Sequence, residues 1–299
     1  MSTLVTVTGA TGNIGRALVE TLLSHGVSVR AVARDASKLE GLVAKGAVAA
    51  AADLSDVAAL TAALKGADAA FLMVPPKYDA PDGIAYQTAS GNAIAEAVEA
   101  SGLKRAVALS SLGGHLASGT GPVAGLHRFE ERLKAIAGLS LVIARPTYFM
   151  ENHLGSMGLI KAAGFNGGTI PGDVPFPMIA TKDIAHALAG VLQTPTWDGV
   201  IVRELLGPRD YTMAEATTIL GAAIGRPGLE YRVLPNEALA QALLGHGFSQ
   251  SIVDGFVELN AFIGGRGMTG LGVRSPETTT PTSLEEFAKA VFAPVYAAS

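Results

Sequence analysis

The fold is decided near the start of the chain by the stretch Leu4-Val-Thr-Val-Thr-Gly9-Ala-Thr-Gly12-Asn-Ile-Gly15. Its first four residues are apolar or β-branched, which is typical of a buried strand. Three glycines follow with the spacing G-x-x-G-x-x-G, and residues 16–24 then carry leucine and valine at helical intervals. A strand, a glycine turn and a helix in this order are the context in which such a motif binds a dinucleotide.

Each glycine has a place in this hypothesis. Gly9 permits the tight turn after the strand, Gly12 lets the backbone approach a pyrophosphate, and Gly15 lets the helix pack on the sheet. The first N–H groups of the helix and its positive dipole end then face the phosphates. A turn without a ligand is the alternative, because the chain contains 36 glycines. We expect cofactor contacts at Gly9, Thr11, Gly12, Asn13, Ile14 and Gly15.

The composition limits the classes of protein to consider. The 299 residues suffice for one large α/β domain, or for a nucleotide-binding domain with a smaller companion. Lys and Arg number 22 and Asp and Glu 26, so the net charge is 22 − 26 = −4, which argues against direct binding of nucleic acid or an anionic membrane. No apolar run approaches the ~18 residues of a membrane span. The first strand leaves no room for a signal peptide, so we expect a cytoplasmic protein.

The second strand indicates which dinucleotide is bound. Strand 27–34 ends at Arg34, about twenty residues after the glycine loop. An acidic residue at this position binds the ribose 2′-hydroxyl of NAD, whereas an arginine accommodates the 2′-phosphate of NADP. Lys38 adds a second cation, and Asp35 lies between the two. We predict NADP(H) in preference to NAD(H); two solvated surface cations are the alternative.

Further strands should end in the same cleft, because ligands of open parallel sheets lie beyond the carboxyl ends of the strands. Strand 46–54 places Asp53 to accept a hydrogen bond from the adenine amino group and Leu54 against the ring. Alternatively, Asp53 or Ser55 caps the following helix. The residues expected beside the riboses are Met73, Val74 and Pro75, and those expected at the nicotinamide are Ser110 and Ser111.

The β-α repetition continues through strand 139–146 and then stops. It predicts a Rossmann-type, doubly wound parallel sheet over residues 1–150. The second half contains short strands and helices, including a helix capped near Thr181. We expect residues 151–299 to form a smaller α/β subdomain on the substrate side, with part of it returning to the sheet.

The residue pair typical of short-chain reductases is missing. In that class Tyr-x-x-x-Lys supplies the proton, because the lysine lowers the pKa of the tyrosine. None of the 6 tyrosines has a lysine four residues later. A G-x-S-x-G elbow is also missing, and neither cysteines nor suitably spaced histidines suggest a metal site. Alcohol dehydrogenation, sugar epimerisation and hydrolysis are therefore disfavoured.

The corresponding helix carries His127-Arg-Phe-Glu-Glu131 instead. Imidazole changes charge near neutral pH, so His127 is a candidate general acid. Glu131 lies one helical turn later and could orient the ring. The alternative is that His127 caps or packs the start of an amphipathic helix, with Glu131 solvated.

Several of these segments together resemble the NmrA-like family of atypical short-chain dehydrogenases/reductases. The serines after strand 104–111 and the later His-x-x-x-Glu are similar to type 2 NADPH quinone reductases and their azoreductase-like relatives. Isoflavone-reductase-like relatives carry a lysine near the position of His127, which disfavours an isoflavone-type substrate. The segments follow the family order over almost the whole chain, and they are Gly9–Gly15, Arg34, Ala144–Asn152, Thr181–Ile184, Leu206–Pro208 and Thr280–Phe287.

This resemblance implies an NADPH-dependent reductase that transfers hydride to a quinone or another small conjugated electrophile. Such acceptors take up hydride without a strong proton donor from the protein, which agrees with the missing tyrosine–lysine pair. Tyr148, in the aromatic segment after strand 139–146, is expected to line the cleft with His127. The family also implies an alternative, a non-catalytic NADP(H) sensor acting through a protein partner, because NmrA binds dinucleotide without clear turnover. The chain could work as a monomer or as a homodimer.

Overall fold

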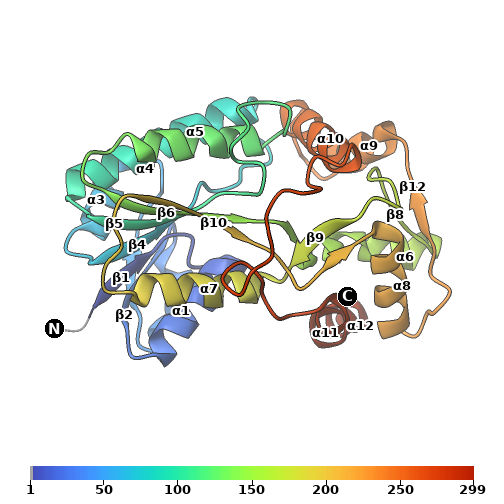
Figure 1. Ribbon diagram of the computed structural model, residues 1–299, viewed down its shortest axis with the longest axis horizontal. Helices are drawn as coiled ribbons and strands as arrows, with labels where there is room; N and C mark the ends of the chain where they lie inside the picture. Colours follow the sequence, from blue (N-terminus) through green and yellow to red (C-terminus); the bar gives the residue numbers. More distant parts are fainter. Residues whose placement is uncertain (1–2) are drawn as a thin grey trace.

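A computed structural model describes residues 3–299, and a seven-stranded parallel sheet forms the centre of the first half (Figure 1). Its strand order is β10-β6-β5-β4-β1-β2-β3. The order reverses between β1 and β4, which is the switch point at which such sheets bind ligands. The strands are β1 (Leu4–Val7), β2 (Ser28–Ala33), β3 (Val48–Ala51), β4 (Ala69–Leu72), β5 (Arg105–Leu109), β6 (Ser140–Pro146) and β10 (Val200–Leu205).

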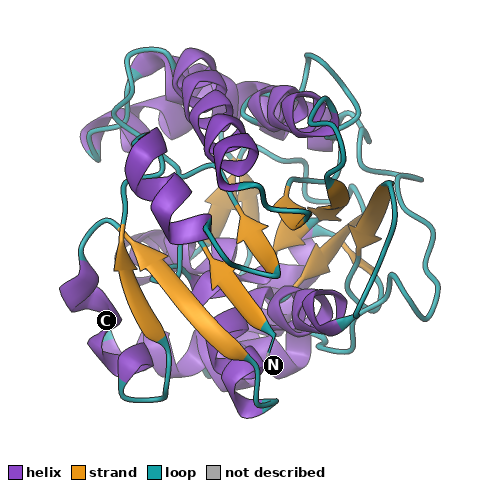
Figure 2. Ribbon diagram, turned by 90° about the vertical axis from the view of Figure 1, so that its left-hand side faces the viewer, coloured by secondary structure: helices purple, strands orange, loops and turns teal. Residues whose placement is uncertain are grey.

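Helices cover both faces of this sheet (Figure 1; Figure 2). Each face has its own apolar core, because the strands are buried on both sides and read as nearly continuous apolar runs. The predicted Rossmann-type doubly wound sheet is therefore confirmed. One face carries α1 (Asn13–Ser24) and α7 (Thr181–Gln193), the other carries α3 (Val57–Leu64), α4 (Gly83–Ser101) and α5 (Val123–Lys134), and η1 (Ala36–Leu39) and α2 (Glu40–Val43) connect β2 to β3.

The second half adds a smaller subdomain with two short sheets, β11-β9-β7 and β12-β8. Its strands are β7 (Tyr148–Phe149), β8 (Asn166–Gly168), β9 (Phe176–Ile179), β11 (Asp210–Tyr211) and β12 (Tyr231–Val233). Its helical segments are η2 (Met150–Ser156), α6 (Met157–Ala163), α8 (Met213–Ala223), α9 (Asn236–Gly245), α10 (Gln250–Gly264), α11 (Leu284–Phe287), η3 (Ala288–Phe292) and α12 (Ala293–Ala298).

The chain crosses between the two parts more than once. After β9 it returns to the first part, where α7 packs along α1 and β10 pairs with β6. The start of α7 is capped by Glu151, whose carboxylate accepts hydrogen bonds from the Thr181 N–H (3.0 Å) and hydroxyl (2.6 Å). The helix begins at Thr181 and is capped there, as predicted, but the capping group comes from a distant segment and not from the residues next to the helix.

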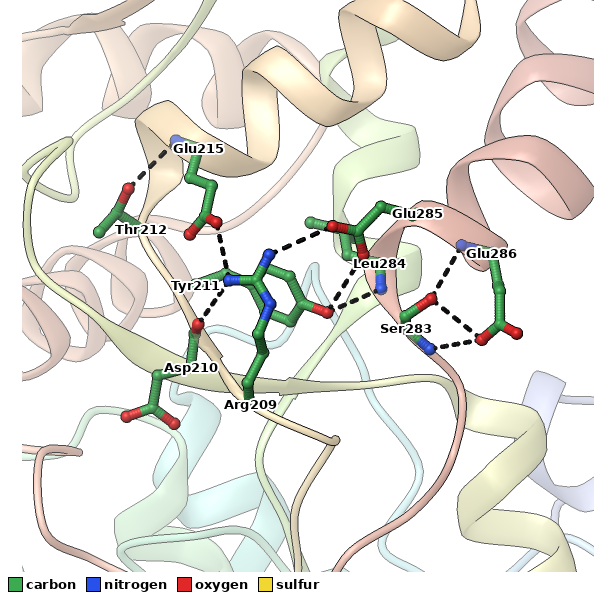
Figure 3. A network of polar contacts seen from close by, with 9 residues as sticks. All are labelled: Arg209, Asp210, Tyr211, Thr212, Glu215, Ser283, Leu284, Glu285 and Glu286. Atoms are coloured by element: carbon green, nitrogen blue, oxygen red, sulfur yellow. Dashed lines mark hydrogen bonds and ion pairs between the residues drawn. The ribbon is translucent and has the colours of Figure 1, made fainter.

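A polar network holds the last helices against the smaller subdomain (Figure 3). The guanidinium of Arg209 binds the carboxylates of Glu215 at 2.7 Å and Glu285 at 3.2 Å. The buried Tyr211 hydroxyl accepts a hydrogen bond of 3.0 Å from the Leu284 N–H. These contacts hold α11 beside β11, at the edge of the apolar core of the smaller subdomain.

Candidate active site

The glycine loop presents unpaired N–H groups at the switch point. Gly9 has a φ of +62°, in the left-handed region that favours glycine. Gly12 precedes α1, and no side chain caps this helix. The N–H groups of Asn13, Ile14 and Gly15 make no hydrogen bond within residues 3–299. Such groups are satisfied by an anion, and a pyrophosphate fits them.

Close contacts explain the glycine spacing. A β-carbon on Gly15 would lie 2.2 Å from the carbonyl oxygen of Gly9, so a side chain there would push α1 away from the loop. A β-carbon on Gly9 would lie 3.0 Å from the Met73 sulfur at the end of β4. A β-carbon on Gly12 would have only the Gly9 carbonyl oxygen near it, at 3.4 Å, so this side of the backbone is open to a ligand. The other exposed residues of the loop are Thr11 and Asn13.

Two exposed cations follow β2. Arg34 and Lys38 form no salt bridge within residues 3–299, although Asp35 lies between them. The Asp35 carboxylate accepts hydrogen bonds from the Ser37 hydroxyl (2.7 Å) and N–H (3.0 Å), and these bonds lower its pKa. Because neither Arg34 nor Lys38 is held in an ion pair, both side chains are available to a phosphate group.

Asp53 follows β3 at the same edge of the sheet. One of its carboxylate oxygens accepts hydrogen bonds from the Ser55 N–H (2.9 Å) and hydroxyl (2.7 Å), which lower the pKa of Asp53. The cap of α3 is Asp56, which accepts a hydrogen bond of 3.0 Å from the Ala59 N–H. The alternative that Asp53 or Ser55 caps this helix is therefore wrong, and the contact of Asp53 with adenine stays a prediction.

The other residues predicted to contact the adenosine half lie deeper. Leu54 is 6% exposed and packs in the core beneath α3, so little of its side chain is left to face a base. Val74 is also buried, whereas Met73 and Pro75 are half-buried where the chain leaves β4. Their contacts with a cofactor stay predictions.

The end of β5 is built around a buried ion pair that the sequence analysis did not identify. Glu130 of α5 is fully buried, and its carboxylate accepts two hydrogen bonds from Arg145 of β6, at 2.9 and 2.6 Å. The Glu130 hydrogen bond raises the pKa of Arg145, so the guanidinium stays charged. The same carboxylate accepts a hydrogen bond of 2.5 Å from the Ser110 hydroxyl. One carboxylate therefore ties together β5, β6 and α5.

Gly114 joins His127 to this network. A β-carbon on Gly114 would lie 2.4 Å from Oε1 of Glu130 and 2.7 Å from Oγ of Ser110. Its carbonyl oxygen lies 3.0 Å from Nδ1 of His127, so this ring nitrogen carries a hydrogen and donates it. Nε2 of the neutral ring then keeps its lone pair. The structure thus brings Ser110 and His127 together around Gly114.

Glu131 makes no hydrogen bond to His127, although the ring is close enough for its charge to lower the pKa of Glu131, so the orienting role of Glu131 stays a prediction. The exposed Glu131 carboxylate forms an ion pair of 2.7 Å with Lys134, which lowers the pKa of Glu131. The ring donates its hydrogen bond to the Gly114 carbonyl instead, because the loop before α5 folds back over the helix. Ser111 is half-buried, and its hydroxyl makes only a long contact of 3.3 Å with a neighbouring carbonyl.

Tyr148 lies beyond the end of β6. Its ring packs against Phe176 and His153, with ring centroids 5.4 and 5.6 Å away. Burial raises the pKa of Tyr148 to about 12, so its hydroxyl stays protonated. That hydroxyl makes no hydrogen bond within residues 3–299. Its place in the cleft stays a prediction.

The buried His153 leads us to expect that the protein is less stable in acid. His153 is 2% exposed, its Nε2 has no hydrogen-bond partner among residues 3–299, and burial lowers its pKa from 6.5 to about 4. Between these values the unfolded chain binds more protons, so stability falls as the pH falls, by about 3 kcal/mol in total. We expect His153→Phe to remove this contribution. Denaturant unfolding at neutral pH and near pH 4 measures it; an unchanged acid sensitivity would refute the assignment.

Within residues 3–299, no three His, Asp or Glu side chains are grouped so that they could hold a metal ion. None of the helices in this part of the chain is long and apolar enough to cross a membrane.

Known proteins resemble this chain along most of its length. It is 29% identical over 291 residues to an NAD(P)H azoreductase of Xenophilus azovorans, covering 96% of this chain and 97% of that protein. It is 27% identical over 255 residues to quinone oxidoreductase 2 of Escherichia coli strain K12, covering 84% and 85%.

Solved structures agree with these matches. The crystal structure of the E. coli NADPH-dependent quinone oxidoreductase complexed with NADPH matches with a TM-score of 0.79 and 25% identity, covering 96% of this chain and 99% of that one. Residues 1–288 match the NmrA-like family. The resemblance read from the motifs is confirmed, and the chain belongs to the NmrA-like family.

Proposed function

We propose that this protein is an NADPH-dependent reductase that transfers a hydride directly to a quinone or another conjugated electrophile. The observation that carries the proposal is the set of unpaired N–H groups at the start of α1, at the same sheet edge as the exposed Arg34 and Lys38. These groups fit the pyrophosphate and the 2′-phosphate of NADPH. The names of the related azoreductase and quinone oxidoreductase support the class of acceptor.

NADPH supplies the hydride; reducing a quinone consumes this hydride and one proton and yields a hydroquinone and NADP⁺. Ser110 directs its hydroxyl hydrogen to Glu130, so only the lone pairs of its oxygen remain to accept a hydrogen bond. His127 holds a hydrogen on Nδ1 and therefore donates from Nε2 only when the ring is doubly protonated. In that form His127 protonates the reduced acceptor. Because the ring is only half-buried, water can then return a proton to His127.

The proposal is tested by following NADPH oxidation with a panel of quinones and azo dyes. We expect turnover, and we expect His127→Ala to lower kcat by about tenfold, at the low end for a general acid because water can protonate a hydroquinone anion. Arg128→Ala, an exposed neighbour on the same helix, is the control and should leave kcat unchanged. Tight NADPH binding without turnover of any acceptor would contradict the proposal and favour a redox sensor.

The choice of dinucleotide has its own test. Arg34→Ala should weaken NADPH binding by about 10- to 100-fold, because a charge-assisted contact with the 2′-phosphate is lost, and should leave NADH binding nearly unchanged. Titration calorimetry with both dinucleotides measures the two affinities. Lys104→Ala, an exposed cation near the amino end of β5, serves as the control. Equal losses for NADPH and NADH would contradict the assignment.

A further inference from the structure

A cavity of about 350 Å³ lies over the amino end of α4. Its walls come from the loop after β4, the first turns of α4, the start of α5 and one side of α10. Pro76 and Lys77 line it and directly follow Pro75, which we expect beside the cofactor riboses. The volume is within the range of about 300–1,000 Å³ that small-molecule sites occupy. The cavity therefore begins where the chain leaves the predicted cofactor site.

The amino end of α10 is fixed to the loop after β4. Tyr78 and Phe248 stack with ring centroids 4.6 Å apart and planes 7° from parallel. The Ser249 N–H donates a hydrogen bond of 2.9 Å to the Tyr78 carbonyl. The Ser251 hydroxyl accepts one of 3.0 Å from the N–H of Gly83. This wall of the cavity is thus built from specific contacts between segments far apart in the chain.

The rest of α10 forms the wall of the cavity that lies next to the loop before α5. A β-carbon on Gly121 would lie 2.0 Å from the Gly255 carbonyl oxygen, so the helix backbone rests directly on the loop before α5. Farther along, the Asn260 amide donates a hydrogen bond of 2.8 Å to Thr169 in the smaller subdomain. Figure 1 shows α10 lying across the end of α5, between the two parts of the molecule.

The chemistry of the lining indicates the ligand. The interior is mostly apolar, and the charged side chains Lys77, Asp254 and Glu258 are exposed at the rim. One uncharged amide, that of Gln87, also lines the cavity and makes no hydrogen bond within the described residues. The lining also includes Tyr78 and Tyr86, whose hydroxyl groups make no hydrogen bond within the described residues. A mostly apolar site with the Gln87 amide and few other polar groups fits a flat aromatic ring that carries an oxygen substituent. The apolar side chains of the lining are Ile84, Pro122, Ile252 and Phe256.

We propose that this cavity binds the second, unreduced ring of a fused two-ring quinone, and that the Gln87 amide donates a hydrogen bond to a hydroxyl on that ring. This inference rests on the proposed reductase function and names its acceptor as a naphthoquinone in preference to a single-ring quinone. The reducible ring then projects from the cavity past Pro76, toward the end of β4.

The test compares benzoquinone with naphthoquinones that do and do not carry a hydroxyl on the second ring. Ile84→Trp fills the cavity and should raise KM for both naphthoquinones by about tenfold or more, because the ring loses its apolar site. KM for benzoquinone and the affinity for NADPH should not change. Gln87→Leu should remove only the preference for the hydroxylated compound, which we expect to be about fivefold.

Ile201→Trp is the matched control, because Ile201 is exposed on the edge strand β10. It should leave every KM unchanged. If Ile84→Trp does not fold, Phe256→Ala takes its place, since it removes a wall of the cavity and should also raise KM for the naphthoquinones. Unchanged KM values in the folded cavity variant would overturn the inference.

Equilibrium dialysis with the hydroxylated naphthoquinone separates this inference from the proposed function. Binding that Ile84→Trp abolishes, without any turnover in the unsubstituted protein, would contradict the reductase function and support the cavity as the binding site. Turnover of naphthoquinones that is insensitive to the cavity variants would contradict only the inference.

Discussion

Replacement of Gly15 by alanine is expected to abolish NADPH binding, with an affinity loss of about 100-fold or more. The new β-carbon would lie 2.2 Å from the Gly9 carbonyl oxygen and 2.8 Å from the Gly9 carbonyl carbon. Both are backbone atoms, so the contact can be relieved only by moving α1 away from the loop. That movement separates the unpaired N–H groups from the place where the phosphates would sit. Titration with NADPH measures the loss.

Gly190→Ala is the matched control for this substitution. Gly190 lies in α7, and a β-carbon there would have no atom within 4 Å. Alanine is the better helix former by up to about 1 kcal/mol, so this variant should be as stable as the original protein or more so, with unchanged NADPH affinity. If Gly15→Ala also bound NADPH with unchanged affinity, the phosphates could not lie at this loop.

Replacement of Glu130 by glutamine is expected to cost about 3–5 kcal/mol of stability, because it leaves the Arg145 guanidinium buried without a counter-charge. The loss should appear in denaturant unfolding. Activity should fall as well, since Ser110 and the loop at Gly114 both rest on the Glu130 carboxylate. We expect kcat to fall more than the affinity for NADPH, because the glycine loop follows β1, on the other side of the sheet's switch point from β5 and β6.

Two variants separate the charge effect from a general loss of packing. Glu131→Gln changes the exposed neighbour, whose pairing with Lys134 should contribute less than about 1 kcal/mol. The double replacement Glu130→Leu with Arg145→Met removes both charges and should recover much of the stability. A double variant as unstable as Glu130→Gln would show that the ion pair is not the source of the effect.

The parallel sheet was predictable because its signals are local. Each strand from β1 to β5 is a largely apolar run followed by a loop and a helical segment, and the glycine loop has a fixed spacing. The short strands of the smaller subdomain carry no such signal. Asp210–Tyr211 becomes a strand only by pairing with Phe176–Pro177, and Asn166–Gly168 contains two glycines. Such strands depend on tertiary contacts, which periodicity does not reveal.

Candidate site residues were predictable where they form a local sequence motif. They were not predictable where tertiary contacts bring together residues that are far apart in the chain. The glycine loop was found from spacing alone. The partner of Glu130 was missed, although the sequence holds a signal: Glu130 shares a helix face with Leu126 and Leu133, and Arg145 ends a run of apolar residues. Two opposite charges, each inside an apolar pattern, suggest a buried pair. The orientation of His127 depends on a carbonyl of the preceding loop, which no spacing rule encodes.

The return of α7 and β10 to the first part of the molecule bears on how this architecture can vary. A chain cut at residue 150 would lose both, so β6 would become an edge strand and the face of α1 that packs on α7 would be bare. The smaller subdomain is therefore not a separate unit that recombination could exchange. New specificities in such a molecule have to arise by substitution in place, and a destabilising change in either part weakens both.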